Sequence, residues 1–321
     1  MVGIREAAEQ LSERQQELDS LEEKFAEHDT IETDDFVREE KLRHPVEKKV
    51  PETVAGIDGG IVKKRYSVGD VVAVRAVAAL LEYSSGRLEE TDYIPSRSPE
   101  PDFEVFESTD DRGMERNAES MRLEKEAETV LEALGKASTV LMDGSVVPSY
   151  LEEDDALEAF NRLFERAEPG QLAGVVEDSY GLRISSLLEE KLGVSPGKTR
   201  DTLLMDAMLE KGERSFVRRY SESPVEHPVL QKLEDRHVNG LFTFYVKLSK
   251  RDLPLRIDYY GSPEEADDIA GKLMFLKASE SYTVPAPVIE ADKRAKVPQE
   301  YLKRFEKRFS PDLRRRDRRS F

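Results

Sequence analysis

Two aspartates occupy matching positions in the sequence and are the strongest candidates for chemistry. Asp58 follows the apolar residues 54–57 and precedes two glycines, in the stretch V-A-G-I-D-G-G-I. Asp143 has the same place in S-T-V-L-M-D-G-S-V-V-P, residues 138–148. Apolar neighbours indicate buried strands, where a carboxylate is costly unless a cation meets it. A hairpin turn is the alternative for either Asp-Gly pair alone, but the matched pair favours a shared metal site.

A helix before the second motif supplies a third acidic candidate. Residues 114–134 have helical spacing, and Glu124 and Glu126 flank the apolar face from opposite sides, each about 80° from its centre. The apolar face is formed by Leu123, Ala127, Val130, Leu131 and Leu134. Because this helix leads directly into the Asp143 strand, acids on its inner edge are expected near the end of that strand.

Carboxylates in this arrangement favour hard divalent cations, magnesium or manganese. Two such ions about 4 Å apart hold the attacking water and the leaving oxygen of a phosphodiester. Asp58 would bridge the ions, Asp143 and the helical glutamate would hold the flanks, and the glycine after each aspartate would let the backbone approach a phosphate. A carboxylate pair for glycoside hydrolysis is the other enzyme class. The absence of Trp and the 7% aromatic content disfavour it.

The elements that position these residues predict an α/β protein. Residues 54–61, 70–83 and 87–94 read as an antiparallel meander with turns at 63–66 and 84–86, so that Asp58 lies on its first strand. Residues 95–112 read as a loop. Further strands are expected at 172–176, 241–248 and 255–260. Further helices are expected at 151–166, 182–192, 202–209 and 263–277, with a short helix within 284–298 that carries Asp292.

The stretch G-V-S-P-G-K-T at residues 193–199 differs from a phosphate-binding loop. It has three residues between the outer glycines instead of four, and a helix precedes it instead of a strand. It is expected to separate two helices.

The N-terminus reads as a helix over residues 1–29. Ile4, Leu11, Leu18 and Phe25 repeat every seven residues, as in a coiled coil. This seam packs either on its own domain or on a second copy in a dimer. Residues 30–52 read as a surface linker. The predicted domains are 1–50 (helix and linker), 51–298 (catalytic domain) and 299–321 (basic tail).

The composition limits the kinds of site and the cellular location that the protein can have. The 321 residues carry a net charge of −18, with 36% charged residues and no cysteine, so disulfides and thiolate zinc sites are excluded. The four histidines (28, 44, 227, 237) show no ligand spacing and are expected on the surface. Neither a membrane span nor a signal peptide is evident, which predicts a cytoplasmic protein. Abundant acids with few aromatics also fit a halophilic proteome, so the charge does not argue against DNA as a partner.

At these motifs the chain resembles the NurA family of DNA end-processing nucleases. The resemblance rests on G-I-D-G-G (56–60), V-L-M-D-G-S-V-V-P (140–148), the Arg/Glu-rich helix and P-A-P-V-I-E-A-D (285–292). It implies an RNase H-like mixed sheet flanked by helices, manganese (or magnesium) dependence, and 5′-to-3′ exonuclease and single-strand endonuclease activity. It also implies a homodimer that works with the hexameric HerA-type ATPase to resect DNA ends in double-strand break repair.

The resemblance also assigns residues. Asp58 and Asp143 match the family's two metal-binding aspartates, and Glu126 fits the helical glutamate better than Glu124. Where the family has Ala-His near its C-terminus, this chain has Ala291-Asp292. Where the family has Tyr-Pro, it has Val284-Pro285, with Tyr282 two residues away. An aspartate can hold a metal but cannot act as an imidazole acid or base at neutral pH.

Two functional readings follow, a metal-dependent DNA nuclease and a catalytically impaired adaptor for the ATPase. A polar ligand-binding domain with two Asp-Gly turns is a third, plainer reading. Residues 301–321 carry nine basic and three acidic residues, a net +6 (9 − 3), and are expected either to contact DNA or the ATPase, or to form a solvated helix.

Overall fold

A computed structural model describes residues 3–107, 110–148, 154–177, 183–197, 199–223 and 227–308. In these residues one mixed sheet of eleven strands has the order β1-β8-β10-β11-β7-β6-β2-β3-β4, with β5 on β3 and β9 on β10. The strands are β1 (Arg43–Pro45), β2 (Thr53–Arg65), β3 (Asp70–Ser84), β4 (Arg87–Ile94), β5 (Asp102–Phe106), β6 (Thr139–Asp143), β7 (Leu172–Val176), β8 (Glu213–Ser215), β9 (Arg218–Arg219), β10 (Leu241–Lys247) and β11 (Leu255–Tyr260).

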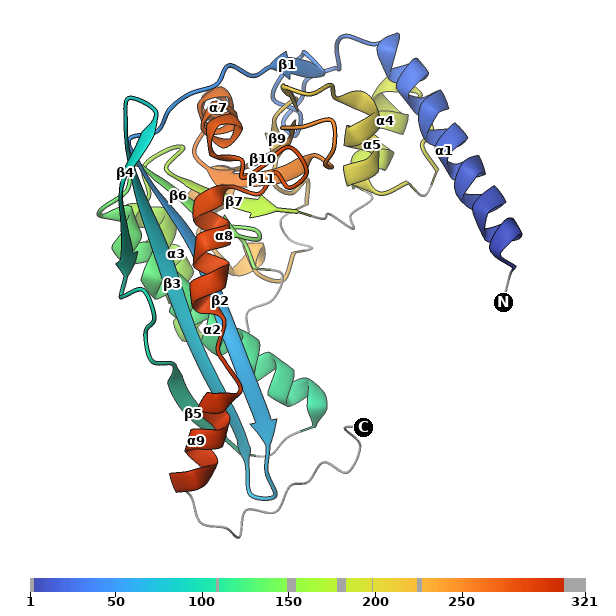
Figure 1. Ribbon diagram of the computed structural model, residues 1–321. Helices are drawn as coiled ribbons and strands as arrows, with labels where there is room; N and C mark the ends of the chain where they lie inside the picture. Colours follow the sequence, from blue (N-terminus) through green and yellow to red (C-terminus); the bar gives the residue numbers. More distant parts are fainter. Residues whose placement is uncertain are drawn as a thin grey trace.

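The predicted meander of β2, β3 and β4 is confirmed, but two of its details are wrong. Residues 63–65 are the end of β2 and not a turn, because Arg65 still pairs with Asp70 in register and the chain reverses at 66–69. The predicted loop at 95–112 contains β5, which pairs with β3. The β2–β3 hairpin is therefore long, and β5 runs along β3 at its far end (Figure 1).

Helices cover both faces of the sheet. The apolar stripe of α2 (Asp111–Leu134) packs with α3 (Asp154–Arg166) on one face, around Ile57, Val140 and Leu172. On the other face α7 (Ala266–Leu276) and α8 (Ala286–Ala295) pack around Leu141 and Val175. Figure 1 shows α8 lying along β2 and β3. The remaining helices are α1 (Ile4–Ala26), α4 (Arg183–Leu192), α5 (Asp201–Met208), α6 (Asp235–Asn239) and α9 (Glu300–Arg308), and the short 3₁₀ turns are η2 (Leu230–Lys232) and η3 (Pro263–Glu265).

The N-terminal helix is confirmed as α1, and its two halves have different surroundings. Leu21 and Phe25 are buried in a cluster with Leu204 and Met205 of α5, so this half packs on its own chain. Leu11 is 67% exposed, and Figure 1 shows the N-terminal half of the helix projecting from the body. Contact with a second copy through this half stays a prediction. Within the described residues no helix is long and apolar enough to cross a membrane.

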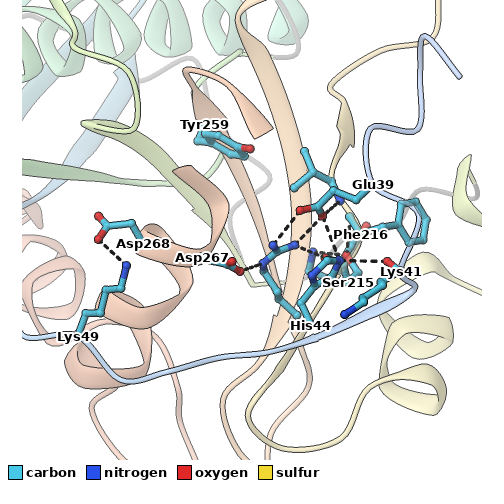
Figure 2. A network of polar contacts seen from close by, with 12 residues as sticks. Glu39, Lys41, His44, Lys49, Ser215, Phe216, Tyr259, Asp267 and Asp268 are labelled. Carbon is cyan, nitrogen blue, oxygen red and sulfur yellow. Dashed lines mark hydrogen bonds and ion pairs between the residues drawn. The ribbon is translucent and has the colours of Figure 1, made fainter. Parts of the chain in front are cut away.

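The segment 30–52 is more than a surface linker, because it is anchored in the sheet. Val37 and Leu42 are fully buried, and β1 pairs with β8. Glu39 receives two hydrogen bonds from the guanidinium group of Arg214, at 2.7 and 2.9 Å, and Asp267 accepts a third at 2.6 Å (Figure 2). Polar composition predicted a loop over the surface. The buried side chains of Val37 and Leu42, the pairing of β1 with β8 and the ion pair of Glu39 with Arg214 instead tie this segment to the fold.

The prediction for one loop is confirmed, and the prediction for one histidine is wrong. Residues 193–199 lie between α4 and α5, as predicted, with residue 198 outside the described part. His237 is only 1% exposed, so its predicted surface position is wrong. Its ring lies 5.8 Å from that of Phe164 and 6.1 Å from that of Tyr260, and this aromatic packing buries it.

Candidate metal centre

Asp58 and Asp143 lie side by side on neighbouring parallel strands. β2 pairs with β6 up to Ile57 opposite Met142, so the next residue on each strand is an aspartate. Side chains alternate along a strand, and both aspartates therefore fall on the face that α8 covers. Asp143 ends β6 as predicted, whereas Asp58 lies in the middle of β2 and not at its end.

Helix α8 reaches this face because β2 carries two glycines there. A Cβ atom on Gly56 would overlap the backbone of Pro287, and one on Gly60 would lie 2.6 Å from the carbonyl carbon of Ala295. The backbone of α8 therefore rests directly on β2 at Gly56 and Gly60. These glycines lie two residues before and two residues after Asp58, on the same face of the sheet. This packing brings Asp292 of α8 to Asp58, whose pKa its charge influences.

Glu126 approaches from the opposite face, past Gly59. Beyond Ile57 the edge of β2 is no longer paired with β6, so a side chain from α2 can pass there. A Cβ atom on Gly59 would lie 2.8 Å from Cγ of Glu126 and 2.9 Å from Cγ of Arg122. The glycine therefore makes room for these two side chains, and not for the approach of backbone to a phosphate as the sequence suggested.

Arg122 holds the carboxylate of Glu126 in this position. Its guanidinium group forms ion pairs with Glu126 and with Glu119. Glu126 is 3% exposed, whereas Glu124 is only partly buried, on a different side of α2. Of the two glutamates that the sequence left open, Glu126 is the one that reaches Asp58.

Burial, together with the charges of neighbouring acids, raises the pKa of three of these carboxyl groups. Burial, then the nearby charge of Asp292, raises the pKa of Asp58 to about 6. Burial, then the charges of Asp58, Glu177 and Asp292, raises the pKa of Asp143 to about 7. Burial raises the pKa of Glu126 to about 8 against the opposing effect of Arg122. Three carboxylates that resist ionisation together are the arrangement that a divalent cation would relieve.

Two further residues at this centre were not among the predicted site residues. Glu177 directly follows β7, the next strand in the sheet, and accepts a hydrogen bond of 3.0 Å from the hydroxyl group of Tyr282. Burial and this carboxylate raise the pKa of Tyr282 to about 12. The sequence signal for Glu177 was available, since a third apolar run ends in an acid as the first two do. Asp178, which follows it, lies outside the described residues.

The donor set fits a hard divalent cation, because it consists of carboxylate oxygens from Asp58, Glu126, Asp143 and Asp292. No three of these oxygen-bearing residues have ligand atoms that all lie within 4.8 Å of one another. Among the described residues, three donors lie mutually within 4.8 Å only at Glu165, Glu234 and His237.

That second group lies on and beside α3 and α6, and no spacing in the sequence pointed to it. Arg236 forms ion pairs with both of its glutamates, at 2.6 and 2.7 Å. A cation there would have to displace the guanidinium group. The better metal site is therefore the group of four carboxylates of Asp58, Glu126, Asp143 and Asp292, here called the carboxylate cluster.

The fold and the carboxylate cluster together define the class of protein. Strands β2, β6 and β7 run parallel, β3 and β4 extend the sheet antiparallel beside β2, and acids from adjacent strands meet acids from helices on both faces. This is the architecture of an RNase H-like, metal-dependent nuclease. The chain belongs to the NurA family, since the NurA domain model matches residues 52–297. A search of curated protein sequences gave no match.

Solved structures agree with this fold at low sequence identity. The NurA nuclease from Sulfolobus solfataricus superimposes with a TM-score of 0.60 at 16% identity, over 94% of this chain and 93% of that one. A structure of NurA with manganese gives 0.54 at 12% identity, over 84% and 92%. A structure of NurA bound to dAMP and manganese gives 0.50 at 11% identity, over 79% and 86%.

Proposed function

We propose that this protein is a manganese- or magnesium-dependent deoxyribonuclease that hydrolyses phosphodiester bonds at the carboxylate cluster. The observation that carries the proposal is the register of β2 and β6, which sets Asp58 and Asp143 side by side where helices from both faces add Glu126 and Asp292. The manganese in related structures supports the choice of metal.

Each residue has a role that its surroundings suit. Asp58 is central in the cluster and would hold the metal together with Asp143, Glu126 and Asp292. When bound, the ions supply Lewis-acid stabilisation of the phosphodiester and a more acidic water. Arg122 orients Glu126 through their ion pair, and Tyr282 orients Glu177 through its hydrogen bond.

The direction of digestion, the type of cut and the partner are inferred from the family. We infer 5′-to-3′ exonuclease and single-strand endonuclease activity in DNA end resection, with a HerA-type hexameric ATPase as the partner. The exposed N-terminal half of α1 supports a homodimer, because Leu11 continues the seam that Leu21 and Phe25 bury on their own chain. Light scattering of the wild type and of Leu11→Glu at high salt tests this contact.

One observation favours a second candidate, a catalytically impaired adaptor for the ATPase. Asp292 replaces the family's histidine, and its carboxylate forms an ion pair of 2.8 Å with Lys296. A protein that binds the ATPase and DNA but lacks an imidazole at this corner could retain the fold without full catalysis.

One experiment separates the two candidates. A 5′-labelled single strand is incubated with the protein and manganese over a range of salt concentrations, and products are resolved on a gel. The nuclease proposal expects nucleotides or short fragments, and a loss of about 10³-fold or more for Asp58→Asn. The matched control is Asp92→Asn, an exposed aspartate of β4, with unchanged activity. No product from the wild type, with binding to the ATPase retained, would establish the adaptor.

A further inference from the structure

A cavity of 280 Å³ opens beside the carboxylate cluster, on the face that α2 covers. Asp143 and Glu126 belong to its wall, so it is continuous with the candidate metal centre. Arg256 of β11 lines it as well. Since β11 lies two strands from β6 in the sheet, Arg256 is about 10 Å across the sheet from Asp143.

The cavity carries charges of opposite sign along this direction. Arg122 also lines it, but its guanidinium group is shared between Glu119 and Glu126. Arg256 is held from behind by Asp258, at 2.9 Å, and Asp258 is fully buried. The cavity therefore has carboxylate groups near β6 and a guanidinium group, itself paired with Asp258, near β11. Cations at the first end and a phosphate at the second would both be matched, because a guanidinium group suits phosphate oxygens.

The wall between the two ends offers an aromatic ring and an apolar surface. Tyr220 lines the cavity, and its hydroxyl group accepts a hydrogen bond of 3.3 Å from Ser145. Met142, Val147 and Val176 contribute apolar side chains. Nucleobases stack on aromatic side chains with little regard to sequence. The cavity is large enough to receive a base beside this ring.

We propose that this cavity binds the nucleotide next to the scissile phosphate of a single DNA strand, with its base on Tyr220 and its phosphate on Arg256. The inference rests on the proposed nuclease function and names the two side chains that hold the substrate strand beside the carboxylate cluster.

The test measures binding of a fluorescent oligothymidylate by anisotropy, with calcium in place of manganese and a gel to confirm an intact strand. We expect Tyr220→Leu to weaken binding about tenfold and Tyr220→Phe to bind within twofold of the wild type. A strand with one run of abasic sites should bind the wild type and Tyr220→Leu equally, because the ring then has no base to stack on.

The phosphate contact has its own measurement. The double variant Arg256→Gln/Asp258→Asn removes both charges, so that no carboxylate is left buried alone. Its plot of log K against log salt should be shallower by about 0.7, the contribution of one phosphate on a single strand. Arg251→Gln, an exposed arginine in the turn of the same hairpin, is the control and should keep the slope of the wild type.

Two results would overturn the inference: wild-type affinity of Tyr220→Leu for both strands, or an unchanged salt slope in the double variant with an unchanged melting temperature. If the wild type cleaves DNA and either result is seen, the cavity assignment fails alone. If the wild type never cleaves but both expected effects on binding appear, the strand-binding site stands and the proposed hydrolysis fails.

Discussion

The Cγ atom of Glu126 lies 2.8 Å from the position that a Cβ atom on Gly59 would occupy. That relationship joins the two faces of the sheet at one point. Asp58 points toward α8, Glu126 comes from α2, and the residue between them must lack a side chain for both to meet. Gly59 is therefore part of the carboxylate cluster, although it offers no ligand.

Gly59→Ala should reduce cleavage about 100-fold, because misplacing a catalytic group by about 1 Å has effects of that size. The added methyl group forces Glu126 and Arg122 to move, and overpacking should lower the free energy of unfolding by about 1–3 kcal/mol. Manganese-dependent cleavage and urea unfolding measure the two effects.

The matched control for this variant is Gly135→Ala, at the end of α2. Its nearest neighbour would be Nη2 of Arg166 at 3.4 Å, at the mobile end of a side chain. Both activity and stability should stay near wild type, within about 0.5 kcal/mol. Equal effects of the two substitutions would show that the space at Gly59 is not specific to Glu126.

Glu126→Gln should stabilise the protein in EDTA at pH 8 and leave it unchanged below pH 4.5. Burial raises the pKa of Glu126 from 4.5 to about 8, so the folded protein keeps a proton that the unfolded chain has released. The free energy of unfolding therefore falls as pH rises from about 4.5 to 8. Glutamine removes that penalty, which is about 4 kcal/mol at pH 8 because each pH unit between 4.5 and 8 costs about 1.4 kcal/mol.

Urea unfolding at pH 4.5 and pH 8 measures the difference. Glu119→Gln is the control, since Glu119 also pairs with Arg122 but has a side chain that is 47% exposed. It should show no gain at pH 8. A Glu126→Gln protein that is less stable than wild type at pH 8 would mean that the ion pair with Arg122 outweighs the burial of Glu126.

Asp292→Ala should lower manganese-dependent cleavage about 10- to 100-fold, the range seen when a metal site loses a supporting group. Asp292→His should retain more activity than Asp292→Ala, because an imidazole can both bind the metal and transfer protons near pH 7. Lys296→Ala, which removes the exposed partner of Asp292, should change the rate less than threefold. Identical rates for all three variants would remove Asp292 from the site.

Glu39→Ala should destabilise the protein by about 3 kcal/mol, because the 2%-exposed side chain of Arg214 would keep only the exposed Asp267 as a carboxylate partner. Figure 2 shows Glu39 and Asp267 in this network, with the exposed pair of Lys49 and Asp268 nearby. Lys49→Ala is the control, and should cost at most about 0.5 kcal/mol. Equal urea midpoints for the two variants would contradict the anchoring of segment 30–52.

Much of the fold could be predicted from local patterns. Alternation, apolar runs and turn residues located β2, β3, β4, β6, β7, β10 and β11, and amphipathic spacing located α1, α2 and α3. The failures are short or polar elements, such as β1, β5, β8 and β9. Their pairing partners are far away in sequence, and a three-residue strand carries no period of its own.

The carboxylate cluster likewise has some features that the sequence predicts and others that only the tertiary structure shows. The sequence alone determined that Asp58 and Asp143 end matching apolar runs and that Glu126 and Asp292 are on helices, because residue type and spacing are local properties. Only the tertiary structure decided that Glu126 and not Glu124 reaches Asp58, that Gly59 serves the glutamate, and that Glu177, Tyr282 and Arg256 lie nearby. Those relations depend on strand register and on which helix covers which face, and the packing of the whole sheet sets both.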